Sequence, residues 1–272
     1  MEKLRIALWV AVFFAVAGLP ACTDSEKGKT ASVTVVAAGQ SSQASQQKPQ
    51  EQEKDADEEG APNPVAATAE KPAPQQASGR QLIYNFDSDS VGQLPAKFHS
   101  ARTGQGSEST WAVIADPTAP SKPNVVAQTS TDKTDYRFPL LIADEGSFRD
   151  LDLSVKFKAV SGSVDQAGGL VFRLRDPNNY YIVRANALED NYRLYHVVAG
   201  RRRQFAGADF KVTSGVWHEL RVEAVGNRFV CYYDGAKKIG ATDDTFKDAG
   251  KVGLWTKADS VTSFDDLTAK AK

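Results

Sequence analysis

The residues best suited to ligand chemistry lie in one basic segment, between Arg173 and Arg203. This segment carries seven arginines against three acidic residues, whereas the whole chain has a net charge of −1. Planar side chains with fixed donors beside an aromatic ring are what a sugar or carboxylate site requires. Alternation along the predicted strands gives the candidate ligand-binding residues: Arg173, Arg184, Asn186, Arg193 and Tyr195. A charged sheet face that binds nothing explains the pattern equally well.

A second basic feature, the run Arg201-Arg202-Arg203, is more typical of a solvated hairpin end than of a phosphate site. Over the whole chain the opposite charges nearly balance, with 33 Lys and Arg against 34 Asp and Glu. No bulk charge therefore points to nucleic acid as a partner.

Catalytic carboxylates are not indicated. A glycosidase needs two carboxylates beside the scissile bond. Glu53, Asp55 and Glu58 match the spacing E-x-D-x-x-E, but they lie in a segment without aromatic residues, where nothing would hold a strand. Glu219 and Glu223 share a predicted strand face and are expected to be solvated. We therefore assign no catalytic residue, which leaves enzymatic activity undecided and favours a binding protein.

The histidines and the cysteine of the predicted domain also give no catalytic pattern. His99, His196 and His218 are far apart and lack the spacing of metal ligands, so we assign no metal site and no cofactor. Cys231 lies in an alternating strand pattern, which predicts a buried structural thiol.

Acidic pairs at the two ends of the predicted domain leave a structural calcium ion as an open alternative. Asp87 and Asp89 begin the domain, and Asp265 and Asp266 end it. If the first and last strands adjoin, these oxygens could share calcium. Capping of turns and strand ends by the same carboxylates is the favoured interpretation.

Short β-strands must position these residues. Leu151–Ala159 alternates strictly between apolar and polar residues, as expected for a half-buried strand. Gly226-Asn227 and Asp234-Gly235 are predicted hairpin turns, because these residue types tolerate positive φ. Further strands are expected at Leu82–Phe86, Trp111–Ala115, Val125–Thr129, Gly169–Arg175, Tyr180–Asn186, Tyr192–Val198, Leu220–Ala224, Arg228–Tyr233, Val252–Thr256 and Val261–Ala269. The predicted fold of residues 81–269 is all-β, a two-sheet antiparallel jelly-roll sandwich.

The N-terminal region predicts where the protein is located. Residues 1–21 have the features of a lipoprotein signal peptide: Lys3 and Arg5, a short apolar run, and Leu19-Pro20-Ala21 before Cys22. We expect Cys22 to be lipidated and to form the mature N-terminus; the alternative is an ordinary signal peptide cleaved near Ala21. Thr23 follows in place of the Asp that commonly retains lipoproteins at the inner membrane. The expected location is therefore the cell envelope, at the outer membrane, facing the periplasm or the cell surface.

The segment from residue 22 to residue 80 is predicted to be a disordered tether. From Thr23 to Arg80 it contains no Phe, Tyr or Trp and is rich in Gln, Ala, Ser, Pro, Lys and Glu. Such a composition cannot bury enough apolar surface to offset the entropy of ordering.

The stretch from Gly168 to Leu267 resembles the concanavalin A-like lectin/glucanase superfamily. It is most similar to laminin-G-like jelly rolls and to bacterial domains named after 3-keto-disaccharide hydrolases. The matching motifs are Gly168–Arg173, Asn178–Arg184, Trp217–Val222, Gly226-Asn227, Asp234-Gly235, Gly250–Trp255 and Phe264–Leu267. The resemblance implies two curved antiparallel sheets, the concave one commonly carrying a carbohydrate site.

Three functional hypotheses follow. The leading one is a lipid-anchored, non-catalytic carbohydrate-binding module, with a glycan as ligand and the membrane contacted through the N-terminal lipid. The second is a glycoside hydrolase resembling the 3-keto-disaccharide hydrolases, which rests on the resemblance alone. The third is a structural or protein-binding envelope module. Fold alone does not decide among them.

Overall fold

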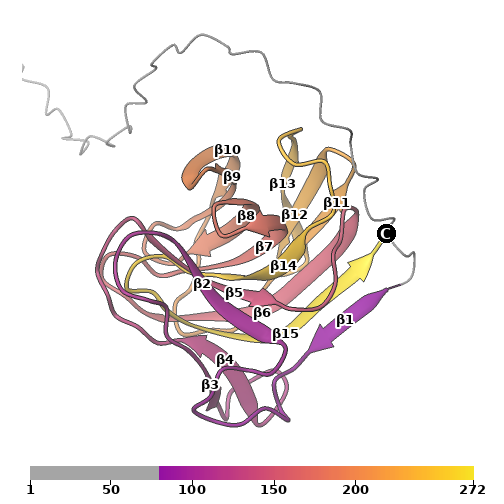
Figure 1. Ribbon diagram of the computed structural model, residues 1–272. Coiled ribbons are helices and arrows are strands. Elements are labelled where there is room, and N and C mark those ends of the chain that lie inside the picture. The colour runs from indigo at the N-terminus through magenta and orange to yellow at the C-terminus, as the bar shows by residue number, and fades with distance from the viewer. Residues whose placement is uncertain (1–79) are drawn as a thin grey trace, which may run out of the picture. The chain divides into compact units, whose positions relative to one another are not determined.

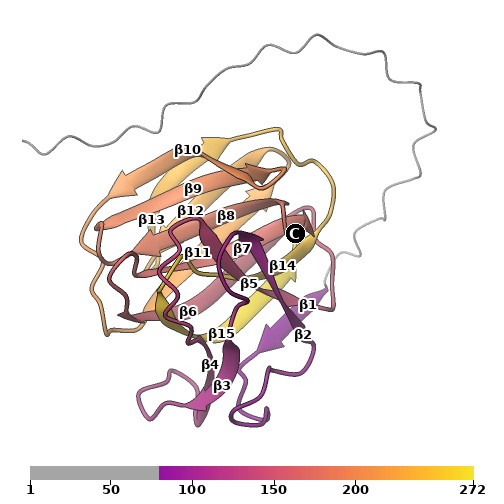
Figure 2. The same cartoon turned by 60° about the vertical axis from the view of Figure 1, so that its left-hand side comes forward.

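The computed structural model describes residues 80–272, which form a sandwich of two antiparallel β-sheets without helices (Figures 1 and 2). This confirms the predicted all-β fold class. The predicted signal peptide, Cys22 and the predicted tether up to residue 79 lie outside the described residues. Within the described range, no helix has the length and apolar character needed to cross a membrane.

One sheet has eight strands in the order β13-β12-β11-β6-β15-β4-β3, with β1 also paired to β15. Its strands are β1 (Gln81–Tyr84), β3 (Trp111–Ala115), β4 (Asn124–Gln128), β6 (Leu151–Ser161), β11 (His218–Val225), β12 (Arg228–Tyr233), β13 (Ala236–Thr242) and β15 (Val261–Ala271). The predicted turns Gly226-Asn227 and Asp234-Gly235 connect β11 to β12 and β12 to β13.

The other sheet has seven strands in the order β10-β9-β8-β7-β14-β5-β2. They are β2 (Phe98–Gly104), β5 (Arg137–Ala143), β7 (Ala167–Asp176), β8 (Asn179–Asn186), β9 (Asn191–Val198), β10 (Arg201–Asp209) and β14 (Lys251–Trp255). Strand β10 forms one edge of this sheet, which Figure 2 shows most clearly.

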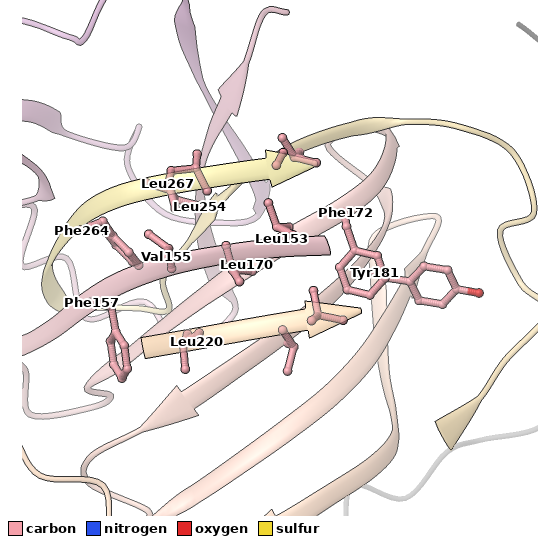
Figure 3. Close-up of a cluster of buried hydrophobic side chains, with 14 of the residues drawn as sticks. Leu153, Val155, Phe157, Leu170, Phe172, Tyr181, Leu220, Leu254, Phe264 and Leu267 are labelled. Atoms are coloured by element: carbon pink, nitrogen blue, oxygen red, sulfur yellow. The ribbon is translucent and has the colours of Figure 1, made fainter. Parts of the chain in front are cut away.

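The main core fills the space between the two sheets (Figure 3). The alternation of β6 predicts its buried face correctly, since Leu153, Val155 and Phe157 point inward. Leu170 and Phe172 of β7 belong to the same apolar cluster. Full burial of each such side chain stabilises the fold by about 1.5–3 kcal/mol.

The outer faces of the two sheets differ in character. On the eight-stranded sheet the outer face carries ion pairs such as Lys156–Glu219, whose side chains are partly exposed. On the seven-stranded sheet it carries a second apolar cluster, which includes Val171, Ile182 and Trp255. Loops must therefore cover this second cluster. Arg137 holds the β2–β3 and β14–β15 loops in place, because its buried guanidinium donates hydrogen bonds to the carbonyls of Ser107, Glu108 and Ala258.

Four strands have no counterpart among the predicted ones: β2, β5, β10 and β13. Strand β5 is buried along its whole length, so its apolar run shows no alternation, and it contains Pro139. Strand β10 begins with three arginines and also lacks a regular pattern.

Candidate functional site

A buried polar group interrupts the apolar outer face of the seven-stranded sheet. We name it the Arg184 cluster, and it consists of Asp165, Arg184, Asn186, Glu189, Asn191 and Tyr195. Strands β8 and β9 supply four of the six residues, the turn between them supplies Glu189, and the loop from β6 to β7 supplies Asp165. The antiparallel register pairs Asn186 with Asn191, which places these two side chains on the same face.

Arg184 organises the cluster. Its Nη2 donates to Glu189 Oε2 at 3.0 Å and to the Tyr195 hydroxyl at 3.0 Å, and its Nη1 donates to Asn191 Oδ1. Only 4% of the residue is exposed. Its Nε is buried without a hydrogen-bond partner among the described residues. A guanidinium held this firmly is a fixed donor, and one of its N–H groups remains unpaired.

The pKa values of two carboxyl groups near Arg184 are shifted in opposite directions. Asp165 accepts a hydrogen bond from Asn186 Nδ2 at 2.9 Å and lies 3.3 Å from Lys257 Nζ. Burial raises the pKa of Asp165 to about 6, despite the opposing charges of Arg184 and Lys257. Partial burial acts to raise the pKa of Glu189, but Arg184 and Asn191 outweigh it and hold that pKa below its usual value.

The cluster reaches solvent through the turn between β8 and β9. The Glu189 side chain is 44% exposed, and Leu188 beside it is also exposed. A backbone hydrogen bond from Ala187 N to Gln166 O joins this turn to the β6–β7 loop, which presents the exposed Val164. The surface beside the cluster thus combines a carboxylate with two apolar side chains, a mixture that suits the polar edges and apolar C–H faces of a sugar ring.

Three of the candidate residues lie together in this cluster: Arg184, Asn186 and Tyr195. Arg193 is paired with Arg184 across the β8–β9 ladder and shares its face. Its guanidinium turns towards the sheet edge, where Nη1 donates to Ala208 O at 3.0 Å and Nη2 contacts Asp209 at 2.5 Å. Arg193 therefore flanks the cluster.

Arg173 does not lie in the cluster, which corrects the prediction of a shared face. It has a φ of 47°, at a register shift in the β7–β8 pairing, so alternation along β7 fails there. Beyond the shift, Leu174 packs in the outer apolar cluster, although alternation predicts an inward position. The Arg173 side chain turns to the end of the sandwich and lies 5.5 Å from the Phe229 ring.

At that end, Arg173 ties three segments of the chain together. Its Nε, Nη1 and Nη2 donate to the carbonyl oxygens of Arg149, Phe246 and Gly226, at 2.8, 2.8 and 2.6 Å. It lines a pocket of about 310 Å³ with Arg149, Gly226, Asn227, Asp243, Asp244, Phe246 and Lys247. Arg173 and Arg184 are both buried and hydrogen-bonded, so each is expected to contribute to the stability of the domain.

Three of the four acidic residues at the domain ends accept protein hydrogen bonds. Asp265 accepts from the backbone and hydroxyl of Ser121, and Asp87 accepts from the Asn124 backbone. Asp89 accepts from the Ala96 backbone. Among residues 80–272, no three His, Cys, Asp or Glu side chains are grouped so that they could hold a metal ion.

Sequence reasoning missed part of the cluster. Asp165 of the cluster and Lys257, which pairs with it, lie in loops far apart in the chain, and no periodicity marks them. Glu189 and Asn191 border a hairpin turn, where polar residues are ordinary. The proximity of Asp165 and Lys257 to Arg184 follows only from the strand order, which brings the β6–β7 and β14–β15 loops to one end of the sheet.

Comparison with known proteins supports the fold and gives no family. No protein-family model matches the chain, and no curated protein matches it. Among solved structures, the carbohydrate-binding module CBM66 from Bacillus subtilis aligns with a TM-score of 0.52 at 21% identity, over 64% of this chain and 95% of that one. A Bacillus subtilis protein of unknown function with a galectin-like fold aligns with a TM-score of 0.48 at 11% identity, over 72% and 97%. At these identities the first likeness shows a shared β-sandwich fold.

Proposed function

We propose that this chain is a lipid-anchored envelope protein whose β-sandwich binds carbohydrate, without cleaving it, at the Arg184 cluster. The observation that carries the proposal is the fixed Arg184 guanidinium, buried among hydrogen-bonding side chains on an otherwise apolar sheet face. Burying a guanidinium is costly, and the hydrogen bonds of the cluster offset that cost. Ordered donors and acceptors of this kind are also what sugar hydroxyls require. The B. subtilis structure that shares the fold is itself named a carbohydrate-binding module.

A glycan array probed with the purified protein tests this proposal. We expect binding to a defined set of oligosaccharides, and we expect Glu189→Gln to weaken it about 10-fold through loss of charge-assisted hydrogen bonds. Glu189 is the suitable position because its side chain is partly exposed, so the variant should fold. Arg175→Gln, which alters an exposed arginine outside the cluster, is the matched control. If no glycan is bound, or if both variants bind as the parent does, the site is wrongly assigned.

A second candidate, glycoside hydrolysis, is favoured by the carboxyl pair. Asp165 and Glu189 both interact with Arg184 and have pKa values displaced in opposite directions, which is how an acid and a base are set apart in glycosidases. Against it, Asp165 is only 1% exposed and already bonded to Asn186 and Lys257. Release of reducing sugar from an array ligand by the parent, abolished in Asp165→Asn, would favour the hydrolase over the binding module.

The membrane anchor is a separate part of the proposal and rests on the sequence around Cys22. We propose lipidation of this cysteine and an outer-membrane location, with the tether holding the sandwich away from the bilayer. A Cys22→Ser protein should move from the detergent phase to the aqueous phase of a detergent extraction. Retention of that variant in the membrane fraction would contradict the proposed lipid anchor and would not bear on the proposed glycan site.

A further inference from the structure

The positive charge of the segment from Arg173 to Arg203 is concentrated at one place in the fold. Four of its arginines have a carboxylate within 4.0 Å: Arg173 with Asp150, Arg175 with Asp248, Arg184 with Glu189 and Arg193 with Asp209. The other three, Arg201, Arg202 and Arg203, form no ion pair with any described residue. They begin β10, at the free edge of the seven-stranded sheet.

Among these three, Arg202 differs from its neighbours. Arg201 and Arg203 are exposed, whereas Arg202 is partly buried and faces the outer apolar cluster. Its guanidinium lies 4.5, 4.8 and 5.8 Å from the rings of Tyr195, Phe138 and Trp255. Its Nη1 is buried and has no hydrogen-bond partner among residues 80–272. Arg202 is thus a partly desolvated cation, stacked on aromatic rings and lacking an acceptor.

Arg202 is contiguous with the Arg184 cluster through Tyr195. The ring of Tyr195 lies 5.6 Å from the Arg184 guanidinium, and its hydroxyl accepts a hydrogen bond from Arg184. Both cations at or beside the cluster are paired, because Arg184 pairs with Glu189 and the neighbouring Lys257 pairs with Asp135 and Asp165. A ligand that spans both places would therefore meet paired charges and hydrogen-bonding groups at the cluster and an unpaired cation at Arg202.

We infer that the ligand is an acidic saccharide, whose hydroxyls bind the Arg184 cluster and whose carboxylate binds Arg202. This inference rests on the proposed carbohydrate-binding function. A carboxylate fits because it can accept two parallel hydrogen bonds from the planar edge of a guanidinium whose face is already stacked. The sugar ring would lie beside the same aromatic rings. The ligand class is therefore a uronic acid-containing oligosaccharide.

The test compares uronic acid oligosaccharides with their carboxyl-reduced, neutral counterparts on one array. We expect the acidic forms to bind about 10- to 100-fold more tightly than the neutral ones, and we expect Arg202→Gln to remove that preference. Arg201→Gln removes the same charge from the exposed neighbouring position and should keep the preference. Circular dichroism of each variant checks that β10 still folds.

The failures are distinguishable. If neutral and acidic sugars bind equally, or if Arg202→Gln retains the preference, this inference is overturned while carbohydrate binding stands. If no sugar of either kind binds, the proposed function fails with it. Anionic phospholipid vesicles, offered to the Cys22→Ser protein, test a lipid surface as the anion. If the protein binds these vesicles but not uronic acid oligosaccharides, and Arg202→Gln abolishes the vesicle binding, the inference is overturned.

Discussion

Replacing Arg173 tests its role directly. The sequence pattern predicts that Arg173 binds the ligand, whereas in the structure it hydrogen-bonds three segments of the chain to one another. Only 1% of it is exposed, and its three donor nitrogens hold backbone carbonyls of Arg149, Gly226 and Phe246. A hydrogen bond to a charged group contributes about 1.5–3 kcal/mol, and water can reach some of the freed carbonyls. We therefore expect Arg173→Ala to lower the free energy of unfolding by about 3–4 kcal/mol. In a domain of this size, that corresponds to a fall in Tm of roughly 10 °C.

Urea unfolding followed by tryptophan fluorescence measures this loss, and an unchanged m-value would show that the unfolding transition itself is the same. Arg175→Ala is the matched control. Its side chain is 44% exposed and pairs with Asp248 at 2.9 Å, so its loss should cost less than about 1 kcal/mol. An Arg173→Ala protein as stable as the parent would refute the structural role. If that stable variant also lost glycan binding, the pocket beside Arg173 would replace the Arg184 cluster as the site.

Two further predictions concern buried titratable groups. The pKa of Asp165 is raised from 3.8 to about 6, so its contribution to stability is present below pH 4 and lost as the pH rises through 6. The unfolding free energy of the parent relative to Asp165→Asn should therefore fall by about 2 kcal/mol between pH 4 and pH 7, and a constant difference in urea unfolding would contradict this. Burial raises the pKa of the Cys231 thiol far above its usual range, so in the Cys22→Ser protein a thiol reagent should react only as the protein unfolds; rapid labelling of that native variant would show that Cys231 is accessible.

The sequence predicts the fold well because alternation survives wherever one sheet face is solvated. Strand β6 is the clearest example, with buried and half-exposed residues in strict turn. Strand β5 lies where the seven-stranded sheet is buried on both faces, so it carries no alternation and went unpredicted. The site was predicted in part for the same reason. Arg184, Asn186 and Tyr195 share a face along regular strands, whereas the bulge at Arg173 breaks the alternation on which its assignment depended.

The remainder of the site depends on tertiary structure. Asp165 and Lys257 meet because two loops converge at one end of the sheet, and no local pattern encodes that meeting. Arg202 belongs to a run typical of a solvated hairpin end, and its neighbours are exposed as expected. Its position over Tyr195 follows from the pairing of β10 with β9, which sequence periodicity does not reveal.

The most direct test of the central claim is an amide chemical-shift titration of the protein with a glycan identified on the array. The account predicts that the largest shifts map to β8, β9 and the turn that carries Glu189, with Tyr195 among them. Shifts centred on Gly226 and Phe246, beside Arg173, or on the charged outer face of the eight-stranded sheet would contradict it.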